Sequence, residues 1–418
     1  MASSKPYTSR KRRRVCSEES SEVQVLDSIE PLVTVSSSMP SSSSERVMDS
    51  MEPLVPTVQS ILDEPVAGPI GIAPGSGGSQ PAITSSSDED EFVTTPVYRP
   101  TGSSGRRIHL SSDEIRSMWN WSKIFSKLGT FDQCVKFAEE RGLVRTERIC
   151  PFHQKPMVIT RDAGQFGRFR CLRNNCRKKD ESRAKGTWFE HVKMPLTLIF
   201  QIMYAFCEGL SYHLTKIELA CENSPVISCH TICDWFNYCR EVIAVHEIQN
   251  QRAQGKIGGP HKVVQIDELK CGKTKYNRGR QIKGHWVIGM IEDGNDDLRL
   301  EVCPDNEISA EILVPLIKKH VAEGSIIHTD SWRPYMSLPD HGYTHKIINH
   351  SDPTKFVAPD GTQKIQREWR GLKKHFRQRP KQDFTLWLGE YSWRRRIHIN
   401  NLDPYEELLI AIKYVYSK

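Results

Sequence analysis

The feature that most constrains this chain is a short apolar run that ends in two acids, Val263 to Glu268 (VVQIDE). Apolar and β-branched residues over such a length are typical of a buried strand. Residues 325–330 (SIIHTD) repeat the pattern and end on Asp330. Two strand-borne aspartates, here Asp267 and Asp330, are a common way to hold Mg²⁺ for phosphoryl transfer, because this ion prefers hard oxygen ligands. Taken singly, each aspartate is better explained as the polar end of a strand.

The neighbouring segments predict further strands and one helix. After a Gly- and Lys-rich segment, 271–283, come two apolar runs, His285 to Ile291 and Leu298 to Val302, with a turn (DGND) between them. Together with the first run they predict a three-strand meander. Residues 307–321 have helical periodicity and precede the strand that ends on Asp330.

Five motifs in the second half of the chain share their order with a known protein family. They read IDELKCGKTKYNRGR, HWVIGMIE, HTDSWRPY, YTHKIINHS and GTQKIQREWRGLKK. They resemble the catalytic core of Merlin-type DDE transposases, the eukaryotic relatives of a bacterial insertion-sequence group, and the resemblance extends from about Ser112 to the C-terminus. It implies a ribonuclease-H-like α/β core in which the first and fourth strands are adjacent and a later helix carries a third acid. It also implies that Asp267 and Asp330 are the first two acids of the family.

The chain departs from that family at the third acid. Where the family has Gln-Asn-Ile-Glu, residues 363–366 read QKIQ. A neutral amide binds Mg²⁺ poorly compared with a carboxylate, so Gln366 is a degenerate catalytic position and strand cleavage is not expected. Glu368 points about 200° away from position 366 on a helix, and Glu268 faces the opposite side of its strand from Asp267. Mg²⁺ is therefore expected as a cofactor only if the chain is an active enzyme.

Charge is divided unevenly along the 418 residues. Residues 1–105 hold eight Lys and Arg against fourteen Asp and Glu, a net charge of −6, so with a total of +7 the remainder carries +13. A basic body favours polyanions, and double-stranded DNA or chromatin is the expected partner; a solvated surface is the alternative. The longest apolar run, Leu196 to Phe206, is shorter than the ~20 residues of a membrane span and reads as a core helix, so no membrane partner is expected.

Four side chains with metal-ligand chemistry lie close together in sequence. Cys150 and His153 form one pair, Cys171 and Cys176 form a second, and a hairpin-length insert separates the pairs. Thiolate and imidazole are the ligands that Zn²⁺ prefers, so the spacing predicts one structural Zn²⁺ in a ribbon. The resembled family usually has Cys-x-x-Cys at the first pair, where this chain has His153. Free structural cysteines are the alternative, and twelve cysteines without a secretory signal indicate a reducing compartment.

Residues 186–249 contain two candidate helices with the spacing of a helix-turn-helix. The first runs through 209–220, a Pro-containing break follows, and the second begins near Ser228, a favourable N-cap. In such folds the second helix enters the major groove, so Ser228, His230 and Thr231 are predicted to contact DNA. A helical hairpin with only a packing role would have the same apolar pattern.

Basic and aromatic residues alternate in two later segments. Residues 369–381 (WRGLKKHFRQRPK) and 393–396 (WRRR) combine Trp with Arg and Lys, which suits phosphate contacts together with base or sugar stacking. The predicted DNA-binding cations are Lys373, Lys374, Arg377, Arg394, Arg395 and Arg396. Solvated basic helix faces are the alternative.

Residues 1–105 are rich in Ser, Pro, Gly and acids and poor in aromatics, a composition that predicts disorder. The run Arg10 to Arg14 (RKRRR) is of the nuclear-localisation type and predicts a nuclear protein. The word DSIEPLV at 27–33 recurs with one change, and residues 23–26 (VQVL) resemble a SUMO-interacting strand; both predict nuclear protein partners. Residues 85–91 (SSSDEDE) are a candidate site for acid-directed phosphorylation.

The predicted fold class is α/β. The predicted segments are a disordered tail, 1–105; a helical lead-in with a zinc-ribbon-like region, 106–185; a helix-turn-helix-like region, 186–249; a linker, 250–261; and a ribonuclease-H-like core with basic C-terminal helices, 262–418. The predicted function is that of a nuclear DNA-binding protein derived from a Merlin-like transposase, without strand cleavage. One alternative is an active transposase that uses Asp267, Asp330 and a displaced acid such as Glu368. Another is a protein-interaction scaffold that acts through the tail motifs. A homo-oligomer is compatible with each.

Overall fold

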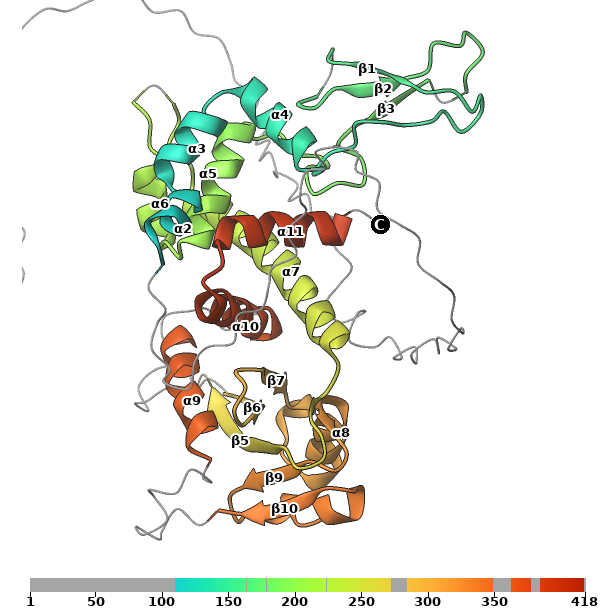
Figure 1. Ribbon diagram of the computed structural model, residues 1–418. Coiled ribbons are helices and arrows are strands. Elements are labelled where there is room, and N and C mark those ends of the chain that lie inside the picture. The colour runs from blue at the N-terminus through green and yellow to red at the C-terminus, as the bar shows by residue number, and fades with distance from the viewer. Residues whose placement is uncertain are drawn as a thin grey trace, which may run out of the picture. The chain divides into compact units, whose positions relative to one another are not determined.

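A computed structural model describes residues 110–162, 164–177, 179–222, 224–271, 284–348, 362–376 and 384–416 (Figure 1). Several predictions concern residues outside these ranges. They are the disordered tail with its nuclear-localisation run, SUMO-like strand and acidic segment, the Gly- and Lys-rich segment after Cys271, and the DNA-binding role of Arg377. These stay predictions.

Three short helices open the described chain: α2 (Ser112–Ser117), α3 (Trp121–Leu128) and α4 (Phe131–Glu140). Each begins at a side-chain cap, because Ser111, Asn120 and Thr130 accept hydrogen bonds from backbone N–H groups of the first turn. After α4, Gly142 takes a φ of 67°, a conformation that glycine adopts without strain. Leu128 of α3 is fully buried and joins the helical core described below.

A small antiparallel sheet follows, in the order β1 (Val158–Thr160), β2 (Arg168–Arg170) and β3 (Asp180–Ser182). We call this region, residues 145–185, the ribbon. Its buried cluster consists of Cys150, Met157, Phe169 and Cys171. So small a core contributes little hydrophobic free energy, and domains of this kind usually depend on a metal or on disulfides. Arg183 ties the end of the ribbon to α4 through an ion pair of 2.7 Å with Glu139.

Together with α3 and α4, further helices from distant parts of the sequence share one hydrophobic core. They are α5 (Leu196–Cys207), α6 (Tyr212–Glu218), α7 (Cys229–Gln254), α10 (Phe384–Asn400) and α11 (Pro404–Tyr416). Trp393 of α10 and Tyr405 of α11 are fully buried in the same cluster as Phe200 of α5. The C-terminal helices therefore complete a core that the earlier helices begin. α7 continues through Gln254, within the segment predicted as a linker.

The apolar run predicted as a core helix forms α5, and nine of its twelve residues are buried, so the prediction is confirmed. Its burial follows from composition, because a helix that is apolar on all sides is stable in water only inside a protein. None of the described helices combines the length and the apolar character that crossing a membrane requires.

The strands predicted around Asp267 and Asp330 are confirmed and form one five-stranded sheet. They are β5 (Val263–Cys271), β6 (His285–Glu292), β7 (Leu298–Val302), β9 (Ile326–Thr329) and β10 (Thr344–Ile347), in the order β10-β9-β5-β6-β7. β5, β6 and β7 form an antiparallel meander, whereas β9 lies parallel to β5 and β10 parallel to β9. A separate parallel pair joins β4 (Ile257–Gly258) to β8 (Val321–Ala322).

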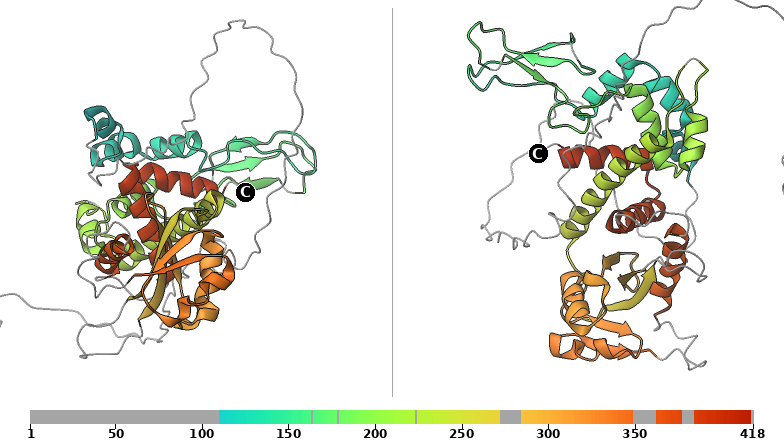
Figure 2. Two further views of the ribbon diagram at one scale, coloured as in Figure 1. Left: turned by 60° about the horizontal axis from the view of Figure 1, so that its bottom comes forward. Right: turned by 180° about the vertical axis from the view of Figure 1, so that it is seen from behind.

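Helices cover both faces of this sheet (Figures 1 and 2). α8 (Ala310–His320), the helix predicted within residues 307–321, packs on the face that carries Ile266 of β5. α9 (Gln363–Phe376) packs on the face that carries Leu269. Side chains alternate along a strand, so Asp267, two residues before Leu269, lies on the α9 face.

A buried ion pair joins α7 to α10. The Arg240 guanidinium donates from Nε to Glu390 Oε2 at 2.8 Å, and the two side chains are 2% and 1% exposed. Arg394 donates to the other oxygen of the same carboxylate at 2.7 Å. The Arg240 guanidinium also lies 3.5 Å from the centroid of the Trp387 ring. Two cations and an aromatic ring thus balance one buried carboxylate, as a charge of this kind requires.

We expect Glu390→Gln to lower the free energy of unfolding by about 3–5 kcal/mol, because it leaves Arg240 buried without its counter-charge. The matched control is Glu140→Gln, which removes an exposed pair with Lys136 and should cost less than about 1 kcal/mol. Urea unfolding of the full chain measures both. The double variant Arg240→Met with Glu390→Leu should recover part of the loss. Equal urea midpoints for Glu390→Gln and Glu140→Gln would show that the buried pair contributes nothing.

Candidate functional site

The strand register sets Asp267 and Asp330 at the same level of neighbouring strands. Gln265 of β5 pairs with His328 of β9 in the parallel ladder, and each aspartate lies two residues further along its chain. Because the strands run in the same direction, both acids lie at the carboxyl ends of the pair. Asp267 is half-buried, and Asp330 is exposed directly after the last residue of β9.

Donors engage both oxygens of the Asp267 carboxylate. Oδ1 accepts from the backbone N–H of Glu268 at 2.9 Å, and Oδ2 accepts from the indole N–H of Trp369 at 2.8 Å. Trp369 reaches the sheet because Gly289, the ladder partner of Asp267 in β6, has no side chain. A Cβ at Gly289 would lie 2.4 Å from the Trp369 ring. Gly289 therefore leaves the space in which Trp369 of α9 reaches Asp267 of β5.

The buried amide of Gln265 fixes the position of α9. Its Oε1 accepts from the backbone N–H groups of Lys364 and Ile365, at 2.9 and 3.2 Å. These are two of the N–H groups that the start of a helix leaves without a partner inside the helix. Ile365 then faces the sheet and is fully buried, whereas Gln366 is exposed. The Gln366 amide lies 3.4 Å from Thr362 Oγ1, one turn back along the helix.

The acid considered as a replacement, Glu368, is committed to a different contact. Arg395 of α10 donates to its two carboxylate oxygens at 2.8 and 3.0 Å, a bidentate geometry. The Tyr391 hydroxyl donates to the same carboxylate at 3.3 Å. The Glu368 and Arg395 side chains are 19% and 13% exposed. Glu368 thus joins α9 to α10; the helical geometry in the sequence had indicated only that it faces away from position 366.

Glu268 is the acid whose environment sequence reasoning did not foresee. Burial, together with the charges of Asp267 and Asp330, raises the pKa of its carboxyl to about 8. Its Oε1 is buried and has no hydrogen-bond partner among the described residues. The strand pattern correctly puts Glu268 on the opposite face from Asp267, but an electrostatic interaction acts through the sheet as well as along one face. Three acids therefore influence one another at this end of β5 and β9.

These acids do not fit a two-metal centre. Such a centre clamps two divalent ions between converging carboxylates. Among the residues that the structure describes, one group of three or more His, Cys, Asp or Glu side chains brings its ligand atoms within 4.8 Å of one another, and it lies in the ribbon. Asp267 and Asp330 lack a third carboxylate on α9, where Gln366 stands. No metal-dependent step follows from this donor set.

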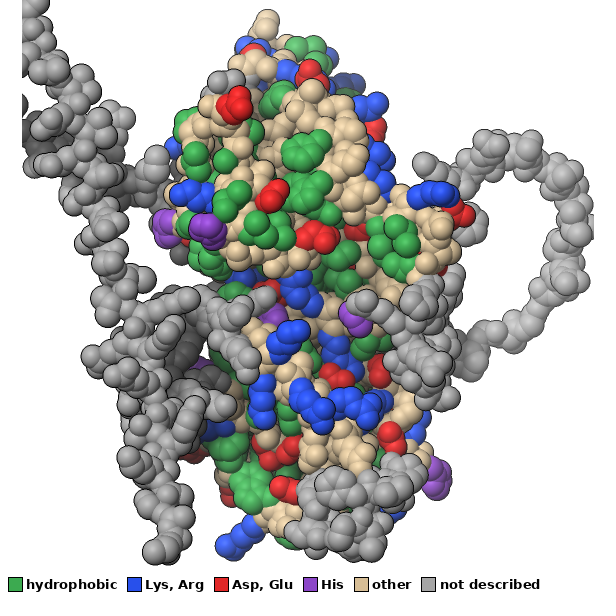
Figure 3. Space-filling model, turned by 90° about the vertical axis from the view of Figure 1, so that its left-hand side faces the viewer, with side chains coloured by type: hydrophobic (Ala, Val, Ile, Leu, Met, Phe, Trp, Pro, Cys, Tyr) green, Lys and Arg blue, Asp and Glu red, His purple; other side chains and the backbone are tan. Residues whose placement is uncertain are grey.

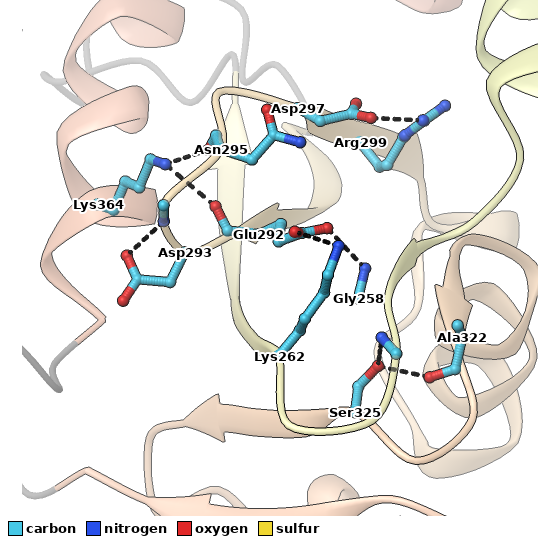
Figure 4. Close-up of polar contacts among 12 residues, drawn as sticks. Gly258, Lys262, Glu292, Asp293, Asn295, Asp297, Arg299, Ala322, Ser325 and Lys364 are labelled. Carbon is cyan, nitrogen blue, oxygen red and sulfur yellow. Dashed lines mark hydrogen bonds and ion pairs between the residues drawn. The ribbon is translucent and has the colours of Figure 1, made fainter. Parts of the chain in front are cut away.

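Lys364 occupies the position at which the resembled family has Asn. Its side chain bonds to the turn between β6 and β7 (Figure 4). Its ammonium donates to the backbone carbonyl oxygens of Glu292, at 3.0 Å, and of Asn295. Burial lowers the pKa of Lys364, while Asp296 and Asp293 act in the opposite direction. The side chain therefore anchors the start of α9 to the edge of the sheet.

The four predicted zinc ligands converge in the ribbon. Cys150 Sγ lies 3.6 Å from Cys176 Sγ and 3.7 Å from His153 Nδ1, and Cys171 Sγ lies 3.6 Å from the same nitrogen. A tetrahedral Zn²⁺ with Zn–S of about 2.3 Å and Zn–N of about 2.05 Å separates its ligand atoms by about 3.6–3.8 Å. The donor set therefore fits Zn²⁺, and four protein ligands leave no open position for chemistry.

The surroundings of Cys150 favour the thiolate form of its side chain. Burial acts to raise its pKa, but backbone N–H groups of His153 and Phe152, with the side chains of His153 and Cys176, lower it to about 6. The thiolate is the form that binds metal. Because the apolar cluster of the ribbon is so small, an ion at this position would hold its two ligand loops together.

The predicted DNA-reading residues lie at the start of α7. Ser228 is the N-cap, as expected, and its hydroxyl accepts from the backbone N–H of Thr231 at 3.0 Å. His230 is 86% exposed and lies 3.8 Å from Asp234. Residues 219–228 connect α6 to α7, a longer connection than the three or four residues of a tight helix-turn-helix. The side chains are accessible, and their role in reading DNA stays a prediction.

The described C-terminal cations divide into two groups. Lys373 and Lys374 are exposed on α9. Figure 3 shows one face of the molecule on which Lys and Arg side chains gather. Arg394, Arg395 and Arg396 are between 13% and 24% exposed and form ion pairs within the chain. Their partners are, in order, Glu390, Glu368, and the pair Glu247 and Glu407. The three consecutive arginines thus connect α10 to its neighbours.

The predicted stacking of bases on the tryptophans of these segments is wrong. Trp369 is 4% exposed, and Trp393 is fully buried. Trp369 packs in the cluster between α9 and the sheet, and Trp393 packs in the helical core. Both tryptophans therefore face the interior and supply apolar area to the two cores, although the Arg394 guanidinium lies 5.5 Å from the centroid of the Trp393 ring.

We expect the full chain to bind one Zn²⁺, because its four ligand atoms match a closed tetrahedral site. Replacing Cys171 and Cys176 by Ser should abolish stoichiometric zinc, measured as metal per chain by mass spectrometry. The matched control replaces Cys221 and Cys229, which are exposed and lie outside the cluster, and should keep the metal. Equal zinc content in both double variants would mean that the cluster is not the site.

Known proteins that resemble this chain include transposases. Residues 254–395, which include Asp267, Asp330 and Gln366, match the ISXO2-like transposase domain. The male abnormal protein mab-31 of Caenorhabditis elegans is 24% identical over 318 residues, which cover 71% of this chain and 70% of that protein. An uncharacterized transposase-like protein of Haemophilus influenzae is 34% identical over 91 residues, which cover 21% of this chain and 72% of that protein. The chain therefore belongs to a transposase-derived family, and residues 254–395 carry the similarity to the ISXO2-like domain.

Proposed function

We propose that this chain is a nuclear DNA-binding protein whose transposase-derived core, of Merlin type, does not cleave strands. The sheet order supports a ribonuclease-H-like core: in chain order its strands are three, two, one, four and five across the sheet, with the first and fourth parallel. The two aspartates at the ends of those strands agree with the family. Fold and ancestry do not by themselves define activity, so the residues of the site carry the argument.

The observation that carries the proposal is the exposed face of α9. Gln366, Arg370 and Lys373 follow one another at helical spacing, so they form one stripe on the surface, with Lys374 beside it. None of these three cations forms an ion pair with another described residue. The position of a metal-binding acid is thus neutral and is followed by free positive charge. Such a stripe suits the phosphates of a duplex better than it suits a divalent cation.

Loss of cleavage follows from charge. Without a carboxylate at position 366, a second divalent ion has too few anionic ligands, and the charge that develops on a scissile phosphate is not balanced. The active-transposase alternative needs Glu368, whose carboxylate is held by Arg395. Releasing it would leave Arg395 partly buried without its partner, which is costly.

The remaining parts of the chain fit the same role. We propose that the ribbon binds a structural zinc ion and that the start of α7 contacts DNA with His230 and its neighbours. Nuclear location rests on the basic run Arg10 to Arg14. Changing those five residues to Ala in a tagged full chain should shift it toward the cytoplasm, and an unchanged nuclear signal would contradict this part.

DNA binding should depend on the α9 stripe. We expect the triple variant Arg370→Ala, Lys373→Ala, Lys374→Ala to bind duplex DNA on the order of tenfold to a hundredfold more weakly than the wild type. The slope of log affinity against log salt should fall by about three, because each lost phosphate contact releases about one counterion less. Fluorescence anisotropy with a labelled duplex over a range of salt concentrations measures both quantities.

The matched control removes three exposed lysines elsewhere, Lys127, Lys136 and Lys318, and so changes the net charge equally. It should leave the salt slope close to that of the wild type. Equal losses in both triple variants would mean that only net charge matters. A wild type that binds no duplex at low salt would refute the proposal and favour a protein-interaction scaffold.

Strand cleavage should be absent from the wild type. We expect no nicking or joining of candidate terminal-repeat DNA with Mg²⁺ or Mn²⁺, because the donor set is incomplete. Asp267→Ala is the control, since it removes a carboxylate that any activity of this core would need. Cleavage by the wild type that disappears in Asp267→Ala would mean that the chain is an active transposase.

A further inference from the structure

The two loops that carry the ribbon's metal ligands expose large apolar side chains. Phe152, between Cys150 and His153, is 52% exposed, and Leu172, directly after Cys171, is 71% exposed. Because the four ligand atoms lie within 4.8 Å of one another, the two loops meet at one end of the ribbon. The two loops therefore bring both exposed apolar side chains to the same end of the ribbon.

Four cations on the same two loops have no ion-pair partner among the described residues. Lys155, Arg173, Arg177 and Lys179 are exposed, and none of them forms an ion pair with another described residue. The arginines of the ribbon strands behave differently, because Arg168 and Arg170 both pair with Asp162 and Asp180. We call the end of the ribbon formed by Phe152, Leu172 and the four unpaired cations the ribbon tip.

We propose that the ribbon tip binds a segment of this same chain, residues 88–93 (DEDEFV), which lie outside the described residues. The segment has four consecutive acids followed by Phe92 and Val93. The acids match the four cations in number and sign, and the two apolar side chains match Phe152 and Leu172. A peptide with acids alone would pair only with the four cations, and a peptide with apolar side chains alone would contact only Phe152 and Leu172. Docking of this segment does not depend on DNA binding or on the loss of cleavage.

The tether between the segment and the described residues has a definite maximum length. Seventeen peptide units separate Val93 from Leu110, where the described residues begin, and an extended chain of that length spans up to about 56 Å. A flexible tether that spans its two sites gives an effective concentration on the order of millimolar. Weak contacts, each worth about 1 kcal/mol, then suffice to keep the tip occupied for much of the time.

Duplex DNA is the other polyanion that the tip can attract. Phosphates would satisfy the four cations, but they offer no apolar surface to Phe152 and Leu172. The segment satisfies both features, and for that reason we choose it. Docking would make the acidic tail a competitor of DNA at the tip.

Carbodiimide crosslinking of the full, zinc-loaded chain tests the contact, because it joins a carboxylate to an amine without a spacer. We expect crosslinks from Asp88 to Glu91 to Lys155 or Lys179, identified by mass spectrometry in the monomeric fraction. The double variant Phe152→Ser, Leu172→Ser keeps every charge and every zinc ligand. It should lower the crosslink yield about tenfold. The variant removes part of two side chains that docking would bury, which costs about 1.4 kcal/mol or more of binding free energy.

Crosslinks from the control acids Glu18, Glu19 and Glu22 to the same lysines should be at background. Zinc content measured on each variant shows whether the ribbon remains intact. Unchanged yield in the double variant with zinc retained would overturn the proposal. So would crosslinks found only between isotopically labelled and unlabelled chains, since that contact is between copies. Absent crosslinks, with weaker DNA binding when Arg173 and Arg177 are changed to Ala, would assign the tip to DNA instead.

Discussion

The contact between α7 and α10 depends on one buried carboxylate, Glu390, which accepts from Arg240 and Arg394. α7 lies in the helical core and leads into the sheet, and α10 returns from α9 to the same helical core. A buried charge cannot be left without its partner except at a cost of several kcal/mol. The two helices are therefore held in one relative position, and the neighbouring Arg395 and Arg396 bond to α9, α7 and α11 from the same helix. The positive charges of this segment therefore pair with carboxylates of the same chain.

The two candidate metal positions differ in how complete their ligand sets are. The ribbon brings three thiols and an imidazole together at distances that a single Zn²⁺ requires. The sheet has two aspartates whose third partner is an amide, and donors from the protein already engage both oxygens of Asp267. The ribbon offers a complete set of four ligands for one ion. In the second, the strand aspartate has become an acceptor for a tryptophan of the helix that covers it.

Local signals in the sequence were sufficient for the strands of the sheet, for α5 and α8 and for the N-cap at Ser228, because period and capping depend on near neighbours. The four zinc ligands were found for the same reason, since their pairs are short in sequence. The partners of Arg394 to Arg396 were not, because they are contributed by four different helices. Burial of Trp369 and Trp393 and the environment of Glu268 likewise depend on packing between distant segments. Sequence pattern located these residues on their elements but did not indicate which side of each element faces the interior.

The Gln265 cap of α9 has a consequence for the history of the protein. One side chain of the central strand bonds two successive N–H groups of the helix, so the helix cannot slide by a residue without losing both bonds. Sliding would also separate Trp369 from Asp267 and Glu368 from Arg395. An acid elsewhere on α9 therefore has no short path to the aspartates. If cleavage has been lost as proposed, a lineage that regained it would have to do so by changing residue 366 itself, whereas the exposed side chains of this helix are free to diverge toward a different use.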